Sequence, residues 1–236
     1  MTTTSISGER TLGDIVAERG AAARVFERHG LDYCCHGQDT LAKACAEAGI
    51  DAEAVAADLD GLAVEPGDTW SRLDMATLAD HIVVTHHHYL REELPLLVAL
   101  ADKVSTVHGQ RHAELAQVHS LVSEVWADLE PHMDKEDNVL FPAIHAIAGG
   151  VTDLPFGSIA NPIAAMVNEH DQVGELLTEL RRITGGYSVP ADGCASYQSL
   201  YQRLEHLELD THLHVLKENH TLFPAAIAAY DAAVGS

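Results

Sequence analysis

One eleven-residue pattern occurs twice in the chain, and it constrains the fold more than any other feature. Residues 132–142 and residues 214–224 both have the form H-x3-E-x3-L-F-P, and six of the eleven positions are identical. Residues four apart lie on the same face of a helix, one turn above each other. Each copy therefore predicts a helix that directs one imidazole and one carboxylate to the same point. The two pairs are His132 with Glu136 and His214 with Glu218.

Both copies lie in long segments with an apolar stripe of helical period, and two further segments have the same kind of stripe. The stripe advances in alternating steps of four and three residues, which keeps it on one face of a helix. Each stripe contains one histidine among apolar residues. Four such segments predict four helices that bury their stripes against one another in a bundle. The stripe histidines are His87, His132, His170 and His214.

The four helices have predictable approximate limits. A short helical tail should follow Pro224. Ser71 or Asp74 is expected to cap the first helix, because such side chains accept hydrogen bonds from free backbone N–H groups. Pro95 should kink or split the first helix and Pro131 should kink the second, because proline donates no backbone hydrogen bond. We expect the helices over residues 71–104, 110–141, 161–185 and 194–223.

The first bundle helix contains three consecutive histidines, His86, His87 and His88. Three successive residues span about 200° of a helix, so at most one of these side chains is expected to face the core. The register through His87 stays apolar, whereas the other two registers meet Glu93 or Arg91. We therefore predict that His87 faces the core.

The first 65 residues predict a small helical unit in front of the bundle. Helical spacing runs from Leu12 to Glu27, and Gly30 follows as a stop signal. Two short helices are expected within residues 40–48 and 51–59, which gives three helices in all. The composition of residues 61–68 indicates a linker. The predicted fold class is all-α, with a small helical domain over residues 1–65 and a four-helix bundle over residues 70–236.

The small domain contains the adjacent cysteines Cys34 and Cys35. Their spacing is not the C-x-x-C of a zinc or thioredoxin site. One interpretation is two small buried residues that only fill the core. The other is a thiol pair at a junction of loop and helix, where a lowered thiolate pKa favours metal or NO chemistry, with His36 and Lys43 nearby to help.

Composition excludes several classes of function. The chain has 36 acidic and 14 basic residues, for a formal net charge of −22, and no cluster of Lys and Arg, so neither nucleic acid nor a membrane is an expected partner. No apolar run approaches the ~18 residues of a spanning helix. The polar start shows no signal peptide, and the four cysteines are irregularly spaced. These features together predict a protein of the reducing cytoplasm.

The two halves of the bundle repeat the same arrangement of polar residues. His87 precedes His132 by 45 residues, and His170 precedes His214 by 44. Folding the halves together would bury four imidazoles and two carboxylates, which is costly unless the groups are compensated. A pair of metal ions resolves the cost. Bridging carboxylates with terminal imidazoles suit two iron ions, whereas zinc prefers a closed site of four ligands.

Several motifs give the chain a resemblance to a known family. The bundle resembles the hemerythrin-like domains, and the whole chain is similar to the repair-of-iron-centres family of di-iron proteins, the YtfE/ScdA type. The small domain matches that family's D-Y-C-C-x-G signature. Further similarities lie in the helices. They are Asp80-His81-Ile82-Val83-Val84 before His87, Leu94-Pro95, His132-Met133 with Lys135-Glu136, Glu169-His170-Asp171 with Gly174-Glu175, and Leu222-Phe223-Pro224.

The resemblance implies roles for particular residues. It implies an oxo- and carboxylate-bridged centre of two iron ions, with both glutamates bridging, and it links the thiols of Cys34 and Cys35 to repair activity. The implied iron ligands are His87, His132, Glu136, His170, His214 and Glu218. The chain departs from the family at His36, which replaces a glycine, at His86, which replaces an aromatic residue, and at Pro131, directly before a ligand. None of these departures removes a ligand.

Three functions are compatible with these residues. The leading hypothesis is donation of iron to iron–sulfur proteins damaged by nitrosative or oxidative stress. Oxygen-transport hemerythrins use five histidines and two carboxylates, and the four histidines here would leave positions for NO, oxygen or water. The alternatives are an enzyme that reduces NO or peroxide with an external donor, and a module that senses oxygen or iron. The remaining alternative is a helical bundle whose metal site is incidental or binds zinc. The oligomeric state stays open, with a homodimer among the options.

Overall fold

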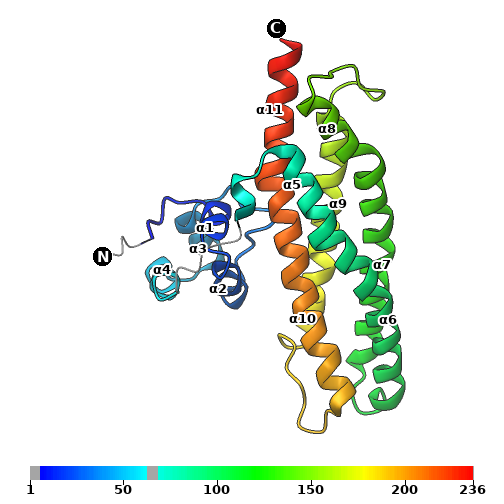
Figure 1. Ribbon diagram of the computed structural model, residues 1–236. Helices are drawn as coiled ribbons and strands as arrows, with labels where there is room; N and C mark the ends of the chain where they lie inside the picture. The colour runs from blue at the N-terminus through cyan, green and yellow to red at the C-terminus, as the bar shows by residue number, and fades with distance from the viewer. Residues whose placement is uncertain (1–5, 63–68, 236) are drawn as a thin grey trace.

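The structure, a computed structural model, describes residues 6–62 and 69–235 (Figure 1). This part of the chain is helical, and its one β-type contact is an isolated bridge between Thr11 and Thr40. Long helices lie side by side in a bundle, and a small helical domain packs beside it. The predicted all-α class is confirmed. None of the described helices has the length and apolar character needed to cross a bilayer.

The bundle is built from four rods, most of which consist of more than one helix. The first rod joins α5 to α6, the second joins α7 to α8, the third is α9, and the fourth joins α10 to α11. Figure 1 shows α11 extending past the upper end of the bundle. The bounds are α5 Met75–Ile82, α6 His88–His108, α7 Glu114–Lys135, α8 Phe141–Ala148, α9 Ala160–Ile183, α10 Ala195–Leu216 and α11 Phe223–Val234.

Short π-helical segments join the helices within three rods. They span Val83–His87, Glu136–Leu140 and Lys217–Leu222. The helices α6 and α7 continue through Pro95 and Pro131, so the split considered at Pro95 was wrong, and a kink at either proline stays a prediction. A π turn pairs each N–H with the carbonyl five residues earlier, and such turns are often found at functional sites.

The L-F-P ends of the repeated pattern explain two of these segments. The N–H of Phe141 bonds the carbonyl of Glu136, and that of Phe223 bonds the carbonyl of Glu218, each five residues earlier. The proline that follows each phenylalanine has no N–H. The change from π-helical to α-helical hydrogen bonding therefore falls at a proline, which has no backbone N–H that would need a partner.

The small domain contains four helices, where we expected three. They are α1 Leu12–Glu18, α2 Ala22–His29, α3 Leu41–Ala48 and α4 Ala52–Asp60. The predicted first helix is divided because Arg19 leaves the helical region, with φ −136° and ψ 86°, and Gly20 follows. Glycine weakens a helix interior, so the break falls there. Most of the predicted linker, residues 63–68, lies outside the described residues.

Capping side chains fix several helix starts. Thr11, Thr40 and Asp51 accept hydrogen bonds from backbone N–H groups in the first turns of α1, α3 and α4. Of the two residues proposed to cap the bundle, Asp74 does so, by accepting from the N–H of Thr77 at 2.9 Å. Each cap satisfies a donor that the helix itself leaves free.

The small domain docks against α10 and the π segment that follows it. The Tyr33 ring meets the His212 ring edge-on, with centroids 5.8 Å apart. His220 contacts Asp14 at 3.1 Å. A Cβ added to Gly13 would lie 2.4 Å from the His220 ring, so only glycine permits this approach. Apolar residues of both domains join one core, which fixes the cysteine loop relative to the bundle.

Candidate metal centre

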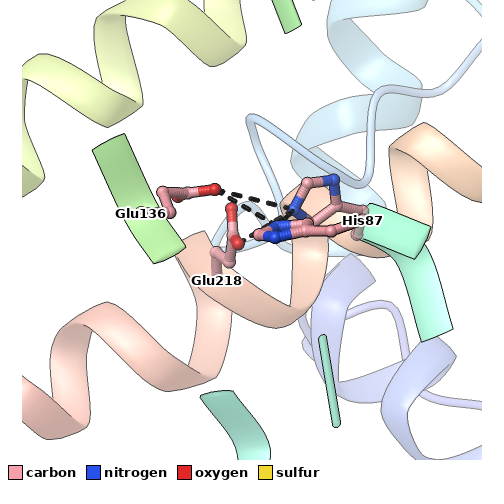
Figure 2. Close-up of side chains that lie close together, drawn as sticks. His87, Glu136 and Glu218 are labelled. Atoms are coloured by element: carbon pink, nitrogen blue, oxygen red, sulfur yellow. Dashed lines mark hydrogen bonds and ion pairs between the residues drawn. The ribbon is translucent and has the colours of Figure 1, made fainter. Parts of the chain in front are cut away.

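The six polar stripe residues converge at one level of the bundle. Each is at most 1 % exposed. Figure 2 shows Glu136 and Glu218 on different rods, with both carboxylates turned toward His87. The structure thus brings together every residue of the predicted set. The full set is His87, His132, Glu136, His170, His214 and Glu218.

Two groups of four potential ligands share the two glutamates. Within each group the potential ligand atoms lie within 4.8 Å of one another. The first group adds His87 and His214, whose Nε2 atoms are 3.1 Å apart. The second adds His132 and His170, whose Nε2 atoms are also 3.1 Å apart. Each group therefore takes one histidine from each half of the bundle.

The shared carboxylates are only partly hydrogen-bonded, since Glu218 Oε1 lies 2.9 Å from His214 Nε2 and Glu218 Oε2 pairs with His170 Nε2 at 3.0 Å. Within the described part of the chain, no hydrogen-bond partner is found for either oxygen of Glu136 or for Oε2 of Glu218. Glu136 Oε2 lies 3.4 Å from His87 Nε2 and 3.3 Å from His132 Nε2. Buried carboxylates are otherwise paired or bound to metal. The donor set of imidazoles and carboxylates fits a pair of iron ions.

The charges of these side chains also support a site for metal cations. Burial alone would lower the pKa of His87 and His132, but nearby carboxylates outweigh it and raise the pKa of each to about 9. Burial alone would raise the pKa of Glu136 and the Glu218 charge adds to this, but His132 and His87 hold it at about 2. Without a metal, protonated His87 and His132 thus compensate Glu136, whereas burial lowers the pKa of His214, beside Glu218, to about 4. Metal cations would replace those protons.

Three oxygen acceptors orient the histidines, and the sequence did not single them out for this role. Asp137 Oδ1 lies 2.8 Å from His87 Nδ1, Glu169 Oε2 lies 2.8 Å from His132 Nδ1, and Asn219 Oδ1 lies 3.0 Å from His170 Nδ1. Such contacts fix which ring nitrogen faces the metal and make it more basic. A signal was present, because Asp137 and Asn219 each directly follow the glutamate of the repeated pattern.

The phenylalanine of each L-F-P sequence stacks on the lone histidine of its own half. Phe141 lies against His87, with ring centroids 5.6 Å apart and planes 13° apart. Phe223 lies against His170 at 6.0 Å and 2°. The rings are buried and cover one side of each imidazole. The repeated pattern therefore supplies a candidate histidine ligand, a glutamate shared by both groups, an acceptor and a covering ring.

His86 is buried as well as His87, which corrects the expectation that at most one of the three histidines faces inward. The two residues lie in the π segment, where the wider turn lets both side chains point into the protein. His86 contacts Asp210 at 3.0 Å and Lys217 Nζ at 2.9 Å. Its ring stacks on His214 at 5.4 Å. His86 thus lies beside the centre, outside the converging set.

The cysteine pair lies in a loop of the small domain. The thiol of Cys34 donates to Asp32 Oδ1 at 3.1 Å, and the two sulfur atoms are 3.7 Å apart. The contact with Cys35, burial and Asp32 raise the pKa of Cys34 well above its usual value. The interpretation with a lowered thiolate pKa at a junction of loop and helix does not hold for Cys34, because no described helix begins at this loop and the neighbouring charge is negative. Asp32, Cys34 and Cys35 still form a group able to hold a metal.

A cavity of about 560 Å³ lies where the cysteine loop meets the bundle. Its lining includes Cys34 and Cys35 from the loop and Asp171 and Glu175 from α9. Asp171 directly follows His170 in the sequence. The cavity therefore reaches the helix that presents a candidate ligand.

Two further histidines, His108 and His36, lie away from the converging set. His108 is near Cys194, close to the start of α10. His36 Nδ1 contacts Asp32 Oδ2 at 2.7 Å, beside the cysteine pair. His36 thus belongs to the thiol loop.

Comparison with known proteins finds a matching family for the bundle and another for the small domain. Residues 78–226 match the hemerythrin HHE cation binding domain family, and residues 8–63 match ScdA_N, described as a domain of unknown function. Over 221 residues the chain is 33 % identical to proteins named iron-sulfur cluster repair protein YtfE from Citrobacter koseri, Escherichia coli O17:K52:H18 and Shigella boydii serotype 4. The match covers 93 % of this chain and 97 % of each relative.

Proposed function

We propose a function from one premise: the chain belongs to the hemerythrin HHE family and, within it, to the proteins related to YtfE. The proposed function is repair of damaged iron–sulfur clusters by donation of iron from a centre of two iron ions. The observation that supports it is the pair of four-residue groups that share Glu136 and Glu218. Damaged iron–sulfur proteins are the proposed recipients.

The number of protein ligands favours release over permanent retention. Each group offers one atom from each of four residues. Iron commonly accepts six ligands, so about two positions at each ion would be left to small molecules such as water, oxygen or NO. Bound iron supplies Lewis acidity and one-electron chemistry. The protein's own contribution is to orient the imidazoles, through Asp137, Glu169 and Asn219, and to exclude bulk water.

The cavity and the thiols offer a route out of the bundle. Asp32, Cys34 and Cys35 form a second group of metal-binding atoms in the lining of the cavity, to which α9 also contributes. Thiolate and carboxylate ligands both accept ferrous iron. We propose that this loop receives iron as it leaves the bundle. A Cys34→Ser, Cys35→Ser variant should then keep its iron and lose transfer.

A cluster-recovery assay tests donation. The iron-loaded chain would be mixed with an apo-ferredoxin-type acceptor and sulfide, and recovery of the acceptor's cluster spectrum would be followed. A Glu136→Ala, Glu218→Ala variant should give no recovery. The matched control is Glu124→Ala, Glu205→Ala, which removes exposed carboxylates from the same two rods. Full recovery with the first variant would refute donation.

The same preparation separates the alternatives. Continuous loss of NO under an external reductant, without cluster recovery, would indicate a reductase. Reversible oxygen binding that is unchanged in the cysteine variant would indicate a sensing module. One zinc per chain after expression with abundant iron would refute the iron centre itself. Sedimentation of the iron-loaded chain would measure the oligomeric state, for which a homodimer is one option.

A further inference from the structure

A second reactive cluster lies at the end of the bundle away from the metal centre. Cys194 immediately precedes α10, and His108 is the last residue of α6. These ends lie at the bottom of the bundle in Figure 1. His214 is 20 residues farther along the α10 rod. At 1.5 Å per residue this places Cys194 about 30 Å from the metal centre along the bundle.

The imidazole of His108 is directed at the sulfur of Cys194. His108 Nε2 lies 3.1 Å from Cys194 Sγ. The side chain of His108 is buried, with 5 % of the residue exposed. Its ring packs edge-on against Tyr197, with centroids 5.5 Å apart. A buried imidazole held in this way has little freedom to turn toward another partner.

The other ring nitrogen of His108 indicates where the hydrogen lies. Among the described residues, Nδ1 has no hydrogen-bond partner. A buried N–H without an acceptor costs more than a lone pair without a donor, so the hydrogen is better placed on Nε2. Nε2–H then donates to the sulfur. A sulfur that accepts this hydrogen bond is favoured as the thiolate.

The backbone at the start of α10 also favours the thiolate form of Cys194. The backbone N–H of Tyr197 and, to a smaller extent, that of Ser196 lower the pKa of the Cys194 thiol, and Lys103 adds to this. Cys34 shows the opposite case, since its contact with Cys35, burial and Asp32 raise its pKa. Cys194 is the exposed cysteine of the four, whereas Cys34 and Cys45 are buried.

We propose that Cys194 is a thiol-modification site that forms mixed disulfides with low-molecular-weight disulfides. The Cys194 thiolate attacks one sulfur of the small disulfide, and a new S–S bond forms as the original S–S bond breaks. The departing thiolate accepts a proton from water. His108 holds the attacking sulfur as the thiolate through its Nε2–H. The reaction needs no metal, so it is independent of the proposed iron chemistry.

Mass spectrometry of the iron-loaded full chain tests this assignment. The chain would be incubated with oxidised glutathione as the probe, and each cysteine-containing peptide would be quantified over time. Cys194 should react about tenfold faster than the same residue in the chain unfolded in urea, as expected for a thiol with a lowered pKa. Equal rates in the folded and unfolded chains would overturn the proposal.

Two variants test whether Cys194 reacts because His108 activates its thiol or only because the thiol is exposed. His108→Gln should slow the reaction of Cys194 about tenfold, because the donor to the sulfur is displaced. His112→Gln is the matched control, since His112 packs on the same Tyr197 but contacts Asp192 and Glu114. An unchanged rate in His108→Gln, with folding verified by circular dichroism, would contradict the role of His108. Iron content should be the same in all three proteins, which keeps this test separate from that of donation.

Discussion

The two halves of the metal centre have the same repeated pattern and differ in how each supports its second histidine. In both halves the residue after the glutamate contacts the lone histidine, and a phenylalanine covers it. His132 Nδ1 has Glu169 as its acceptor. His214 Nδ1 has no hydrogen-bond partner among the described residues, and His86 stacks on its ring instead.

This difference arises from the residue that precedes each lone histidine. Glu169 precedes His170, and His86 precedes His87. The glutamate reaches across to His132, and Lys135 also contacts it. His86 turns instead to Asp210 and Lys217. The same ligand types in the same repeated pattern therefore receive unequal support, so the two proposed metal positions differ in the hydrogen bonds behind their histidines.

Removal of a shared glutamate should have the largest effect, and it should erase the difference between the positions. Glu136→Ala deletes a carboxylate common to both groups, so both ions should be lost, and metal content per chain should fall close to zero. Elemental analysis after desalting would measure it. His132→Ala is the comparison, because it removes a ligand from one group and should spare part of the metal. Equal retention in the two variants would contradict shared ligation.

An intermediate effect should appear in the kinetics of metal removal. Loss of an acceptor behind a ligating histidine typically costs 10–100-fold in metal affinity. The ion beside His87 and His214 should therefore leave to a chelator first, about tenfold faster than the ion beside His132 and His170. Release followed by absorbance should show two phases.

Glu169→Gln should reduce the difference between these phases. The amide oxygen is a weaker acceptor for His132 Nδ1–H than the carboxylate, so the slower phase should accelerate toward the faster one. Glu179→Gln is the control, because that residue lies on the same helix and pairs with Arg182. A single phase in the unaltered chain would show that the two metal positions are equivalent, and two unchanged phases in Glu169→Gln would show that Glu169 is not the source of their difference.

The convergence of the ligand set could be predicted from the sequence, whereas its surroundings could not. Helical periodicity relates His132 to Glu136 without further information. Contacts such as Glu169 with His132 join different rods and depend on rotamers and helix register. His86 was misplaced because uniform α-helical geometry was assumed through a π segment. The raised pKa of Cys34 depends on how Asp32 folds back in the loop, which spacing does not reveal.

The covering rings should show the smallest effect, and they test the part of the comparison in which the halves agree. Phe141→Leu and Phe223→Leu each replace a buried ring that stacks on an imidazole. The loss of ring contact and of packing should cost about 1–2 kcal/mol of unfolding free energy in each variant. Urea denaturation of the metal-free proteins measures both values. Because the two rings occupy matching places in the repeated pattern, the costs should agree within about 0.5 kcal/mol. A clearly larger cost at one position would show that the asymmetry between the halves extends from the histidine supports to the packing around them.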